Sequence, residues 1–230
     1  MHLRALLFLT TDVAYTPYVP TCTNESTMQN ALMRLFFADI TNAGRAELAD
    51  GVDPKNYLNY AGVDTSVGVV DGIDYYRQDI GNLNIHFLPP TTRNVRVSQC
   101  QQHYQLHTRM LPKRLLVLSV YQNELFGTID LSHLPPKFER LFAFKNAICG
   151  PIDLTFLPST VLVINLRFNR INQKVVRYGN LPLKVKQISL GSQANGSSVR
   201  AIRAISADQS VDAKRAHVIF GDLKLLTPPK

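Results

Sequence analysis

The feature that most constrains this chain is a repeat that recurs at a constant interval. Residues 127–136 read GTIDLSHLPP, and residues 150–159 read GPIDLTFLPS. Leu-Pro pairs begin at equal steps along the chain, at Leu88, Leu111, Leu134 and Leu157, and a further pair begins one residue late, at Leu181. A constant interval of this length indicates that the chain is built from copies of one supersecondary unit, each of which buries its apolar face against the next.

The units follow the template LPxxLxxLxLxxNxLxGxIDLxx. This apolar spacing, at a period within about 20–29 residues, is the signature of a leucine-rich repeat. Each unit is expected to give one short strand to a parallel sheet, with alternate apolar residues pointing into the core. The units at 66–87 and beyond residue 181 are less regular, as expected at the ends of a stack, so the sequence predicts about five coils.

One polar position in the repeat is expected to be structural. Asn123, Asn146 and Asn169 occupy it in three successive units, and Cys100 occupies it in the unit before them. An amide at this point satisfies backbone groups where the chain turns away from the strand, and buried backbone groups without partners are costly. We therefore interpret these four residues as a structural ladder.

The repeat divides the chain into four parts. We predict an N-terminal arm over 1–25, a helical cap over 26–65, repeats over 66–198, and a C-terminal cap and tail over 199–230. Ser26 followed by Gln29 predicts a capping box, and the apolar spacing after it predicts a helix over 26–43.

The connecting segments carry weaker signals. Residues 44–65 are expected to form a loop with a turn at Asp53-Pro54, and residues 191–198 a second loop. Residues 199–220 are expected to place a strand and a short helix on the far end of the stack. The fold class is α/β, a leucine-rich repeat solenoid of parallel strands with a helical N-terminal cap.

The compartment is constrained by cysteine content and by the start of the chain. Cys22, Cys100 and Cys149 are an odd and sparse set, which favours a reducing, intracellular compartment. No apolar run approaches the roughly 20 residues of a membrane span. The stretch over 1–22 fits an extended arm better than a secretory signal, and a mitochondrial presequence is the alternative.

The net charge of +8 is unevenly distributed. Residues 1–87 hold 5 Lys and Arg against 10 Asp and Glu, for a net of −5. Residues 88–180 hold 12 against 4, and residues 181–230 hold 8 against 3, for nets of +8 and +5. The basic repeats favour an acidic partner, whether protein, nucleic acid or lipid.

Aromatic and basic residues share the outward positions of the predicted strands, on the face expected to be concave. Aromatic side chains mixed with Arg dominate protein interfaces, and contiguous exposed apolar patches mark contact sites. The alternative is that the protein's own tail covers this face. The predicted partner-binding residues are Arg96, Tyr121, Arg140, Phe142, Phe144, Lys145, Arg167 and Phe168.

The sequence carries no recognisable catalytic motif, so we predict no enzymatic activity, cofactor, metal or small-molecule substrate. His103 and His107 are four residues apart, but the repeat register places them in a connection rather than on a helix, where that spacing would suit a metal. Asp130 and Asp153 occupy equivalent repeat positions and are expected to accept backbone hydrogen bonds at a turn.

Over roughly residues 28–205 the chain resembles leucine-rich repeat proteins of the kinetoplastid type. The resemblance includes LMRLFFADITNA (32–43), the LPP starts and the phrases GTIDL and GPIDL. YAGVDTSVGVV (60–70) is similar to the amino-terminal cap of plant-type repeats, but Tyr60 and Asp64 stand where a Trp and a Cys are usual, which argues against a cap disulfide. The resemblance also implies that Cys100 is an accepted substitute for Asn in the ladder, and that the coil is right-handed and binds a partner.

Two functions from different classes follow. The first is a non-enzymatic protein-binding module, an adaptor or subunit of a larger assembly that binds an acidic partner through the concave face. The second is an RNA-contacting structural subunit of a ribonucleoprotein complex, because the same rings can stack on bases while Arg and Lys hold phosphates. Neither the aromatic RNP pattern nor GxxG is present in the sequence.

Overall fold

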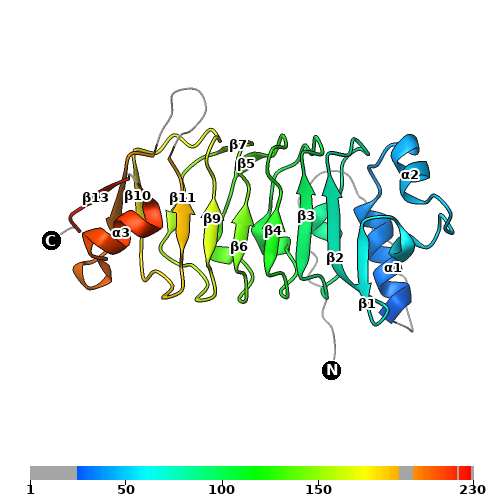
Figure 1. The fold of residues 1–230 in the computed structure, drawn as a ribbon, viewed down its shortest axis with the longest axis horizontal. Helices are drawn as coiled ribbons and strands as arrows, with labels where there is room; N and C mark the ends of the chain where they lie inside the picture. The colour runs from blue at the N-terminus through cyan, green and yellow to red at the C-terminus, as the bar shows by residue number, and fades with distance from the viewer. Residues whose placement is uncertain (1–24, 192–198, 222, 229–230) are drawn as a thin grey trace, which may run out of the picture.

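The structure is a computed structural model that describes residues 25–191, 199–221 and 223–228. The molecule is elongated, with successive coils stacked along its long axis and helices at both ends (Figure 1). Apart from Glu25 and Gly191, the predicted arm over 1–25 and the predicted loop over 191–198 lie outside the described residues, as does Cys22.

A seven-stranded sheet forms one side of the stack, in the order β1-β2-β3-β4-β6-β9-β11. β1 is antiparallel to β2, and every later pair in this sheet is parallel. Paired residues are about one repeat apart in the sequence, as Gly72 is from its partner Asn94 and Val163 is from its partner Gln187. The strands are β1 (Val63–Ser66), β2 (Val69–Tyr76), β3 (Asn94–Ser98), β4 (Val117–Ser119), β6 (Arg140–Phe142), β9 (Val163–Asn165) and β11 (Gln187–Ser189).

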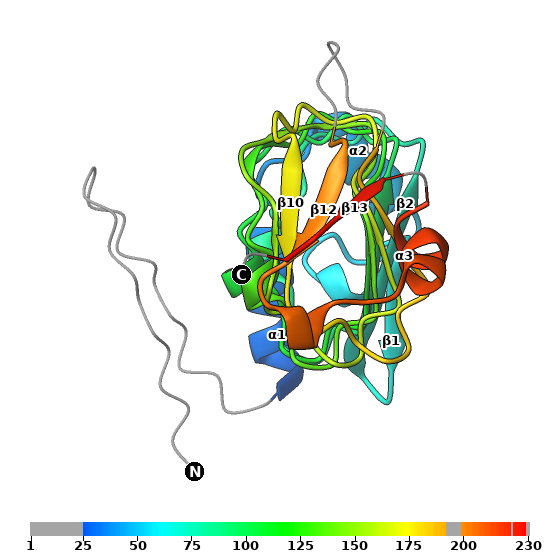
Figure 2. The same ribbon diagram turned by 90° about the vertical axis from the view of Figure 1, so that its left-hand side faces the viewer.

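The opposite side of the stack carries two smaller parallel sheets that the sequence analysis did not predict. Figure 2, viewed along the stack, shows strands of the larger one facing the seven-stranded sheet across the interior. Their orders are β5-β7 and β13-β12-β10-β8. The strands are β5 (Phe126–Thr128), β7 (Ala147–Cys149), β8 (Asp153–Leu154), β10 (Val175–Tyr178), β12 (Ala201–Ala204) and β13 (Lys224–Leu226).

The hydrophobic core lies between the two sides and repeats from coil to coil. Leu118, Leu141 and Ile164 project into it from the seven-stranded sheet and are fully buried. Each Leu-Pro start is followed by the same tight turn; for example, the N–H of Leu115 donates to the carbonyl of Pro112 at 3.0 Å. Short 3-10 helices precede three of these starts: η2 (Ile85–Phe87), η3 (Thr108–Met110) and η4 (Leu131–His133).

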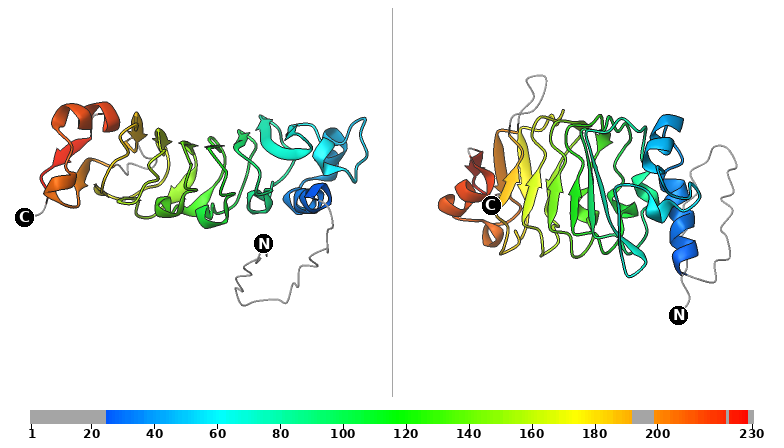
Figure 3. Two further views of the ribbon diagram at one scale, coloured as in Figure 1. Left: turned by 90° about the horizontal axis from the view of Figure 1, so that it is seen from below. Right: turned by 45° about the vertical axis from the view of Figure 1, so that its right-hand side comes forward.

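At the N-terminal end, aromatic rings join the helices to the first coil. The helical elements there are α1 (Glu25–Phe36), α2 (Asn42–Leu48) and η1 (Tyr57–Asn59), and Figure 3 shows α1 and α2 together at this end. The ring of Phe37 lies 5.0 Å from that of Tyr60 and 6.4 Å from that of Tyr75. Because Met33, Phe36 and Phe37 are fully buried, this end of the core is closed against α1.

The predicted helix over 26–43 is wrong over residues 37–41, where the chain turns between α1 and α2. The predicted loop over 44–65 is wrong over residues 44–48, which belong to α2. Contacts with the first coil end α1, because the N–H of Asn84 donates to the carbonyl of Phe36 at 2.8 Å. The next residues then pair with the coil instead, through a bridge between Ile40 and Gly81. Thr41 restarts a helix by accepting the N–H of Gly44 at 2.9 Å.

The predicted capping box of Ser26 and Gln29 does not form as expected. α1 begins at Glu25, so Ser26 lies inside the helix rather than at its cap. The Gln29 side chain is fully buried, and its Oε1 accepts the N–H of Val70 at 2.7 Å. Gln29 therefore ties α1 to β2, a use of the amide that a local sequence pattern does not reveal.

At the C-terminal end, the strand and short helix predicted over 199–220 are present as β12 and α3 (Ala213–Phe220), with η6 (Ala207–Gln209) between them. Asp212 caps α3 by accepting the N–H of Arg215 at 2.8 Å. α3 packs beside β11. Within the described ranges, no helix has the length and apolar character needed to cross a membrane.

Candidate interaction surface

The ladder asparagines bind backbone groups of two successive coils. Nδ2 of Asn146 donates to the carbonyl of Val120 in the preceding coil at 2.9 Å and to that of Ala143 in its own coil at 3.1 Å. Its Oδ1 accepts the N–H of Leu125 at 3.0 Å. Asn123 and Asn169 make the corresponding bonds. These amides therefore tie each coil to the one before it.

The residue before each ladder position has a left-handed backbone. These residues are Gln99, Gln122, Lys145 and Phe168, with φ between 55° and 59°. Residues other than glycine rarely adopt this conformation, and holding it costs about 1 kcal/mol or more. The hydrogen bonds made by the ladder asparagines offset that cost. They also fix the direction in which the side chain of the preceding residue leaves the sheet.

Cys100 takes only part of the ladder's role. Its Sγ lies 3.5 Å from the carbonyl of Tyr75 and 3.3 Å from that of Ser98, and burial raises the pKa of the thiol. The fully buried Gln102 supplies an acceptor nearby: its Oε1 accepts the N–H of Leu83 at 2.7 Å, and its Nε2 donates to the carbonyl of Gly81 at 2.8 Å. The sequence analysis did not identify Gln102, because no other unit has glutamine at this position.

The outward side of the seven-stranded sheet, with the residues that directly follow its strands, brings the predicted partner-binding residues together. We call this surface the strand face, and define it by Tyr76, Arg77, Arg96, Tyr121, Arg140, Phe142, Phe144, Lys145, Arg167 and Phe168. The sheet register aligns Arg96, Ser119, Phe142 and Asn165 in one row across the coils. The residues just after these strands form a second row, which backbone hydrogen bonds hold in line. The N–H of Gln122 donates to the carbonyl of Phe144, and the N–H of Lys145 donates to the carbonyl of Arg167.

The aromatic rings of the strand face support one another. The rings of Tyr121 and Phe144 are parallel within 5°, with centroids 4.6 Å apart. Phe168 is 44% exposed, and the guanidinium of Arg167 lies 5.1 Å from its ring centroid. Tyr121, Phe142 and Phe144 are half-buried rather than fully exposed, and the stacked rings of Tyr121 and Phe144 cover one another across neighbouring coils. The face is thus a pre-ordered aromatic platform.

The cations of the strand face differ in their partners. Arg96 forms an ion pair with Asp74 at 2.8 Å, and Arg140 lies 3.5 Å from Glu139. Both pairs are solvent-exposed and contribute little stability. Lys145 is exposed and forms no ion pair with any residue that the structure describes. Its charge is therefore available to a carboxylate or phosphate.

The first coil adds a cluster that the predicted partner-binding set did not include. The Arg77 guanidinium lies 5.1 Å from the ring centroid of Tyr76 and donates to Oε1 of Gln99 at 3.0 Å. Nε2 of Gln99 donates to the Tyr76 hydroxyl at 3.0 Å. Tyr76 and Arg77 therefore extend the same surface to the first coil.

The C-terminal helix stands at one end of the strand face and does not cover its centre. A groove of about 520 Å³ separates α3 from β9 and β11. Its lining includes Arg167, Gln187 and Ser189 on one side and Val218 on the other. Phe142 and Phe144 are not part of this lining. Among the described residues, α3 packs against β11, at one end of the strand face.

The histidines of the connections have structural partners. Nδ1 of His103 lies 3.5 Å from Glu124, while the N–H of His107 donates to Nε2 of His86 at 3.1 Å. Burial, followed by the neighbouring His107, lowers the pKa of His86 to about 4. No group of three or more metal-ligating side chains occurs in the described part of the chain.

The turn role predicted for two carboxylates is confirmed. Asp130 accepts the N–H of Ser132 at 3.0 Å, and Asp153 accepts that of Thr155 at 2.8 Å. The hydrogen bond from the Ser132 hydroxyl lowers the pKa of Asp130. Because the two bonds are equivalent in successive coils, these carboxylates belong to the repeat rather than to a reactive site.

No protein-family model and no curated protein matches the chain. Among solved structures it is similar to the crystal structure of a pollen receptor kinase 3, with a TM-score of 0.57 and 19% identity over 87% of this chain and 97% of that chain. The BIR3–SERK2 complex from Arabidopsis thaliana also matches, with a TM-score of 0.43 and 13% identity over 87% of this chain and 96% of that chain. A similarity this low supports no conclusion about the fold. The first similarity shows the fold, which is a leucine-rich repeat fold with parallel strands.

Proposed function

We propose that this chain is a non-enzymatic protein-binding module, an adaptor or subunit of a larger assembly, that contacts an acidic partner through the strand face. In this proposal residues 26–65 and 199–230 act as caps that close the two ends of a right-handed coil. One observation carries the proposal: rings and cations from five successive coils gather on one surface, with Tyr121 stacked on Phe144 and Arg167 beside Phe168.

Two physical arguments support protein binding at this face. Aromatic and arginine side chains supply most of the binding energy in protein interfaces. Rings that already stack on one another lose little side-chain entropy when a partner arrives, so less of the interaction energy is lost to ordering. Residues 88–230 carry a net charge of +13, the sum of +8 and +5 for their two parts, which favours an acidic partner and fast association with it.

The test removes two side chains at the centre of the strand face. A tagged chain with Arg140→Ala and Phe142→Ala is compared with the unaltered chain in affinity purification from the native source, with partners quantified by mass spectrometry. We expect the specific partner to fall at least tenfold, because each of these side chains is worth about 1 kcal/mol or more in a binding centre.

A matched control carries Arg109→Ala and Met110→Ala, an exposed basic and apolar pair in a connection away from the strand face. It should keep the partner. Circular dichroism and thermal unfolding of both variants show whether the fold is intact. Equal recovery of the partner by the strand-face variant and the unaltered chain would reject the surface.

An RNA-binding function is the second candidate, because Tyr121, Phe144 and Phe168 can stack on unpaired bases while Lys145 contacts phosphate. The lack of the aromatic RNP pattern and of GxxG in the sequence disfavours this function. Fluorescence anisotropy with single-stranded oligouridine at several salt concentrations separates the two. RNA binding requires a log–log salt slope of about −0.7 per phosphate contacted, and no affinity at low salt would exclude this function.

A further inference from the structure

The smaller four-stranded sheet carries an unusual concentration of positive charge. The chain has no Asp or Glu from residue 154 to residue 207, a stretch that holds eight Lys and Arg. Two of these residues, Arg177 on β10 and Arg203 on β12, pair directly in the parallel register. Neighbouring strands lie about 4.8 Å apart, and like charges side by side on one face of a sheet are unfavourable.

Strand alternation places both arginines on the outward side of this sheet. Val176 and Ile202 are fully buried, so the residues that follow them, Arg177 and Arg203, point away from the core. We call this surface the four-stranded face, and define it by Val175, Arg177, Ala201, Arg203, Lys224 and Leu226, whose register pairs are continuous across the sheet.

No carboxylate of the described chain neutralises this arginine pair. Asp153 is next to Arg177 in the register, but its Oδ1 accepts the N–H of Thr155, and no ion pair joins it to either arginine. The Nε of Arg203 is buried and makes no hydrogen bond. Two guanidinium groups side by side without a carboxylate between them favour an anionic group placed at this point of the sheet.

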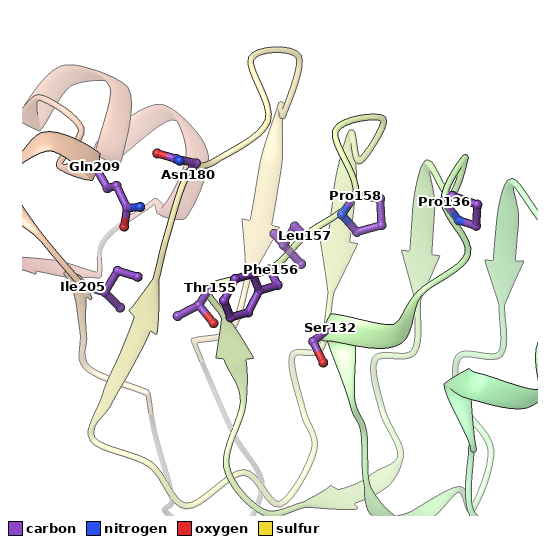
Figure 4. A pocket seen from close by; sticks show the side chains of 9 residues that line it. All are labelled: Ser132, Pro136, Thr155, Phe156, Leu157, Pro158, Asn180, Ile205 and Gln209. Atoms are coloured by element: carbon purple, nitrogen blue, oxygen red, sulfur yellow. The ribbon is translucent and has the colours of Figure 1, made fainter.

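An apolar hollow adjoins the arginine pair at the carboxyl ends of β8, β10 and β12. Figure 4 shows Thr155, Phe156 and Ile205 around this hollow, whose volume is about 460 Å³. Phe156 is 72% exposed and Ile205 is 37% exposed. Ile205 follows Arg203 by two residues, just beyond the end of β12, so one side of the hollow lies close to the arginine pair. Exposed large apolar side chains around a concavity are typical of a contact site.

We propose that the four-stranded face is a second docking surface, for a partner protein segment that places a carboxylate between Arg177 and Arg203 and an apolar side chain in the hollow. Side chains two residues apart on an extended segment point to the same side, about 6.6 Å apart, so one short segment can present both groups to this surface. A peptide fits better than RNA, because Phe156 is the one aromatic ring among the described residues that line the hollow, whereas single-stranded RNA is bound by several rings on which successive bases stack. The surface lies on the opposite side of the stack from the strand face (Figure 2), so neither proposal depends on the other.

The test is a titration of the full-length, ¹⁵N-labelled chain, followed by amide chemical shifts. The probe is the blocked peptide acetyl-Gly-Glu-Ser-Leu-Gly-amide, with Glu and Leu two residues apart. We expect saturable shifts at residues 175–179 and 201–206. The probe with Glu replaced by Gln, and the probe with Leu replaced by Ala, should each bind at least fivefold more weakly. No saturable shift at about 10 mM peptide would overturn the proposal.

Variants of the chain test the same two contacts from the side of the protein. Arg177→Gln changes an exposed side chain and should weaken the Glu-containing peptide about tenfold, while Lys145→Gln on the strand face should leave it unchanged. Phe156→Ser should weaken the same peptide, and its effect should vanish for the Ala-containing probe. The Arg140→Ala and Phe142→Ala variant should bind normally, which separates a failure here from a failure of the proposed function.

Three other outcomes would also overturn the proposal. Shifts centred on residues 140–145 would place the peptide on the strand face. Inorganic phosphate that binds as tightly as the peptide, with no difference between the Leu and Ala probes, would reduce the surface to a general anion site. Oligouridine that produces the same shifts at lower concentration than the peptide would assign the surface to RNA.

Discussion

Side-chain amides bind backbone groups along several of the connections that follow the strands. The asparagines at 123, 146 and 169 do so at the repeat interval, whereas Gln102 and Gln173 do so only once each. Gln173 accepts the N–H of Ile152 at 2.6 Å and donates to its carbonyl at 3.2 Å. Gln102 forms hydrogen bonds with the unit over 66–87, which is one residue shorter than the repeat. Gln173 lies in the unit over 157–180, which is one residue longer than the repeat. Glutamine therefore bridges the backbone where the repeat interval changes.

Replacing Asn146 by Ala should destabilise the fold by about 2–4 kcal/mol, because it leaves buried backbone groups of two coils without partners. Urea denaturation followed by circular dichroism measures this through the midpoint. Asn172→Ala, an exposed asparagine in the next coil, is the matched control and should change the free energy of unfolding by about 0.5 kcal/mol or less. Equal effects of the two substitutions would contradict the ladder's role.

Val67 is strained at the tip of the β1–β2 hairpin. It has φ of 53°, a conformation that β-branched residues rarely adopt, and its side chain is fully exposed. Val67→Asn should therefore stabilise the protein by about 1 kcal/mol and raise the Tm by about 2–4 °C. Thr65→Asn, at an exposed position within β1, should lower the Tm slightly because asparagine is unfavourable in strands. A Tm lowered by Val67→Asn would show that the backbone at Val67 is not strained.

At the scale of elements, bends between the two sides of the stack set where the smaller sheets can form. Gly127 and Gly150 have φ of 75° and 80° and lie in or next to the paired strands β5 and β7. The sequence analysis did not predict these strands, because FGT and AIC are too short to show an alternating pattern.

Gly150→Ala should destabilise the protein by about 2–4 kcal/mol for two reasons. The added Cβ would lie only 2.4 Å from Cγ2 of Thr128, and the backbone at this residue is left-handed, a conformation that alanine rarely adopts. Gly51→Ala isolates the backbone contribution, since Gly51 has φ of 73° with nothing within 4 Å of the added Cβ. It should cost about 1 kcal/mol. Thermal unfolding of the two variants gives the difference, and equal losses would show that packing against β5 is unimportant.

On the scale of the whole molecule, each coil is stabilised by its two neighbours. Stability in such a stack is the sum of unit and interface contributions, so central coils should open least often. Amide hydrogen exchange should be slowest at Leu118, Leu141 and Ile164 and at least tenfold faster in α3 and in the β1–β2 hairpin. Mass spectrometry of peptic fragments resolves these regions. Uniform protection from end to end would indicate one cooperative unit instead.

The repeat by itself determined the parallel stacking, the inward apolar residues, the ladder positions and the outward direction of the strand-face side chains, because each depends on a spacing that recurs along the chain. Only the tertiary structure decided where α1 ends, how Gln29 and Gln102 are used, and that two arginines meet beside an apolar hollow. These features depend on contacts between residues that are distant in sequence and occur once, and a periodic pattern carries no information about a contact that is not repeated.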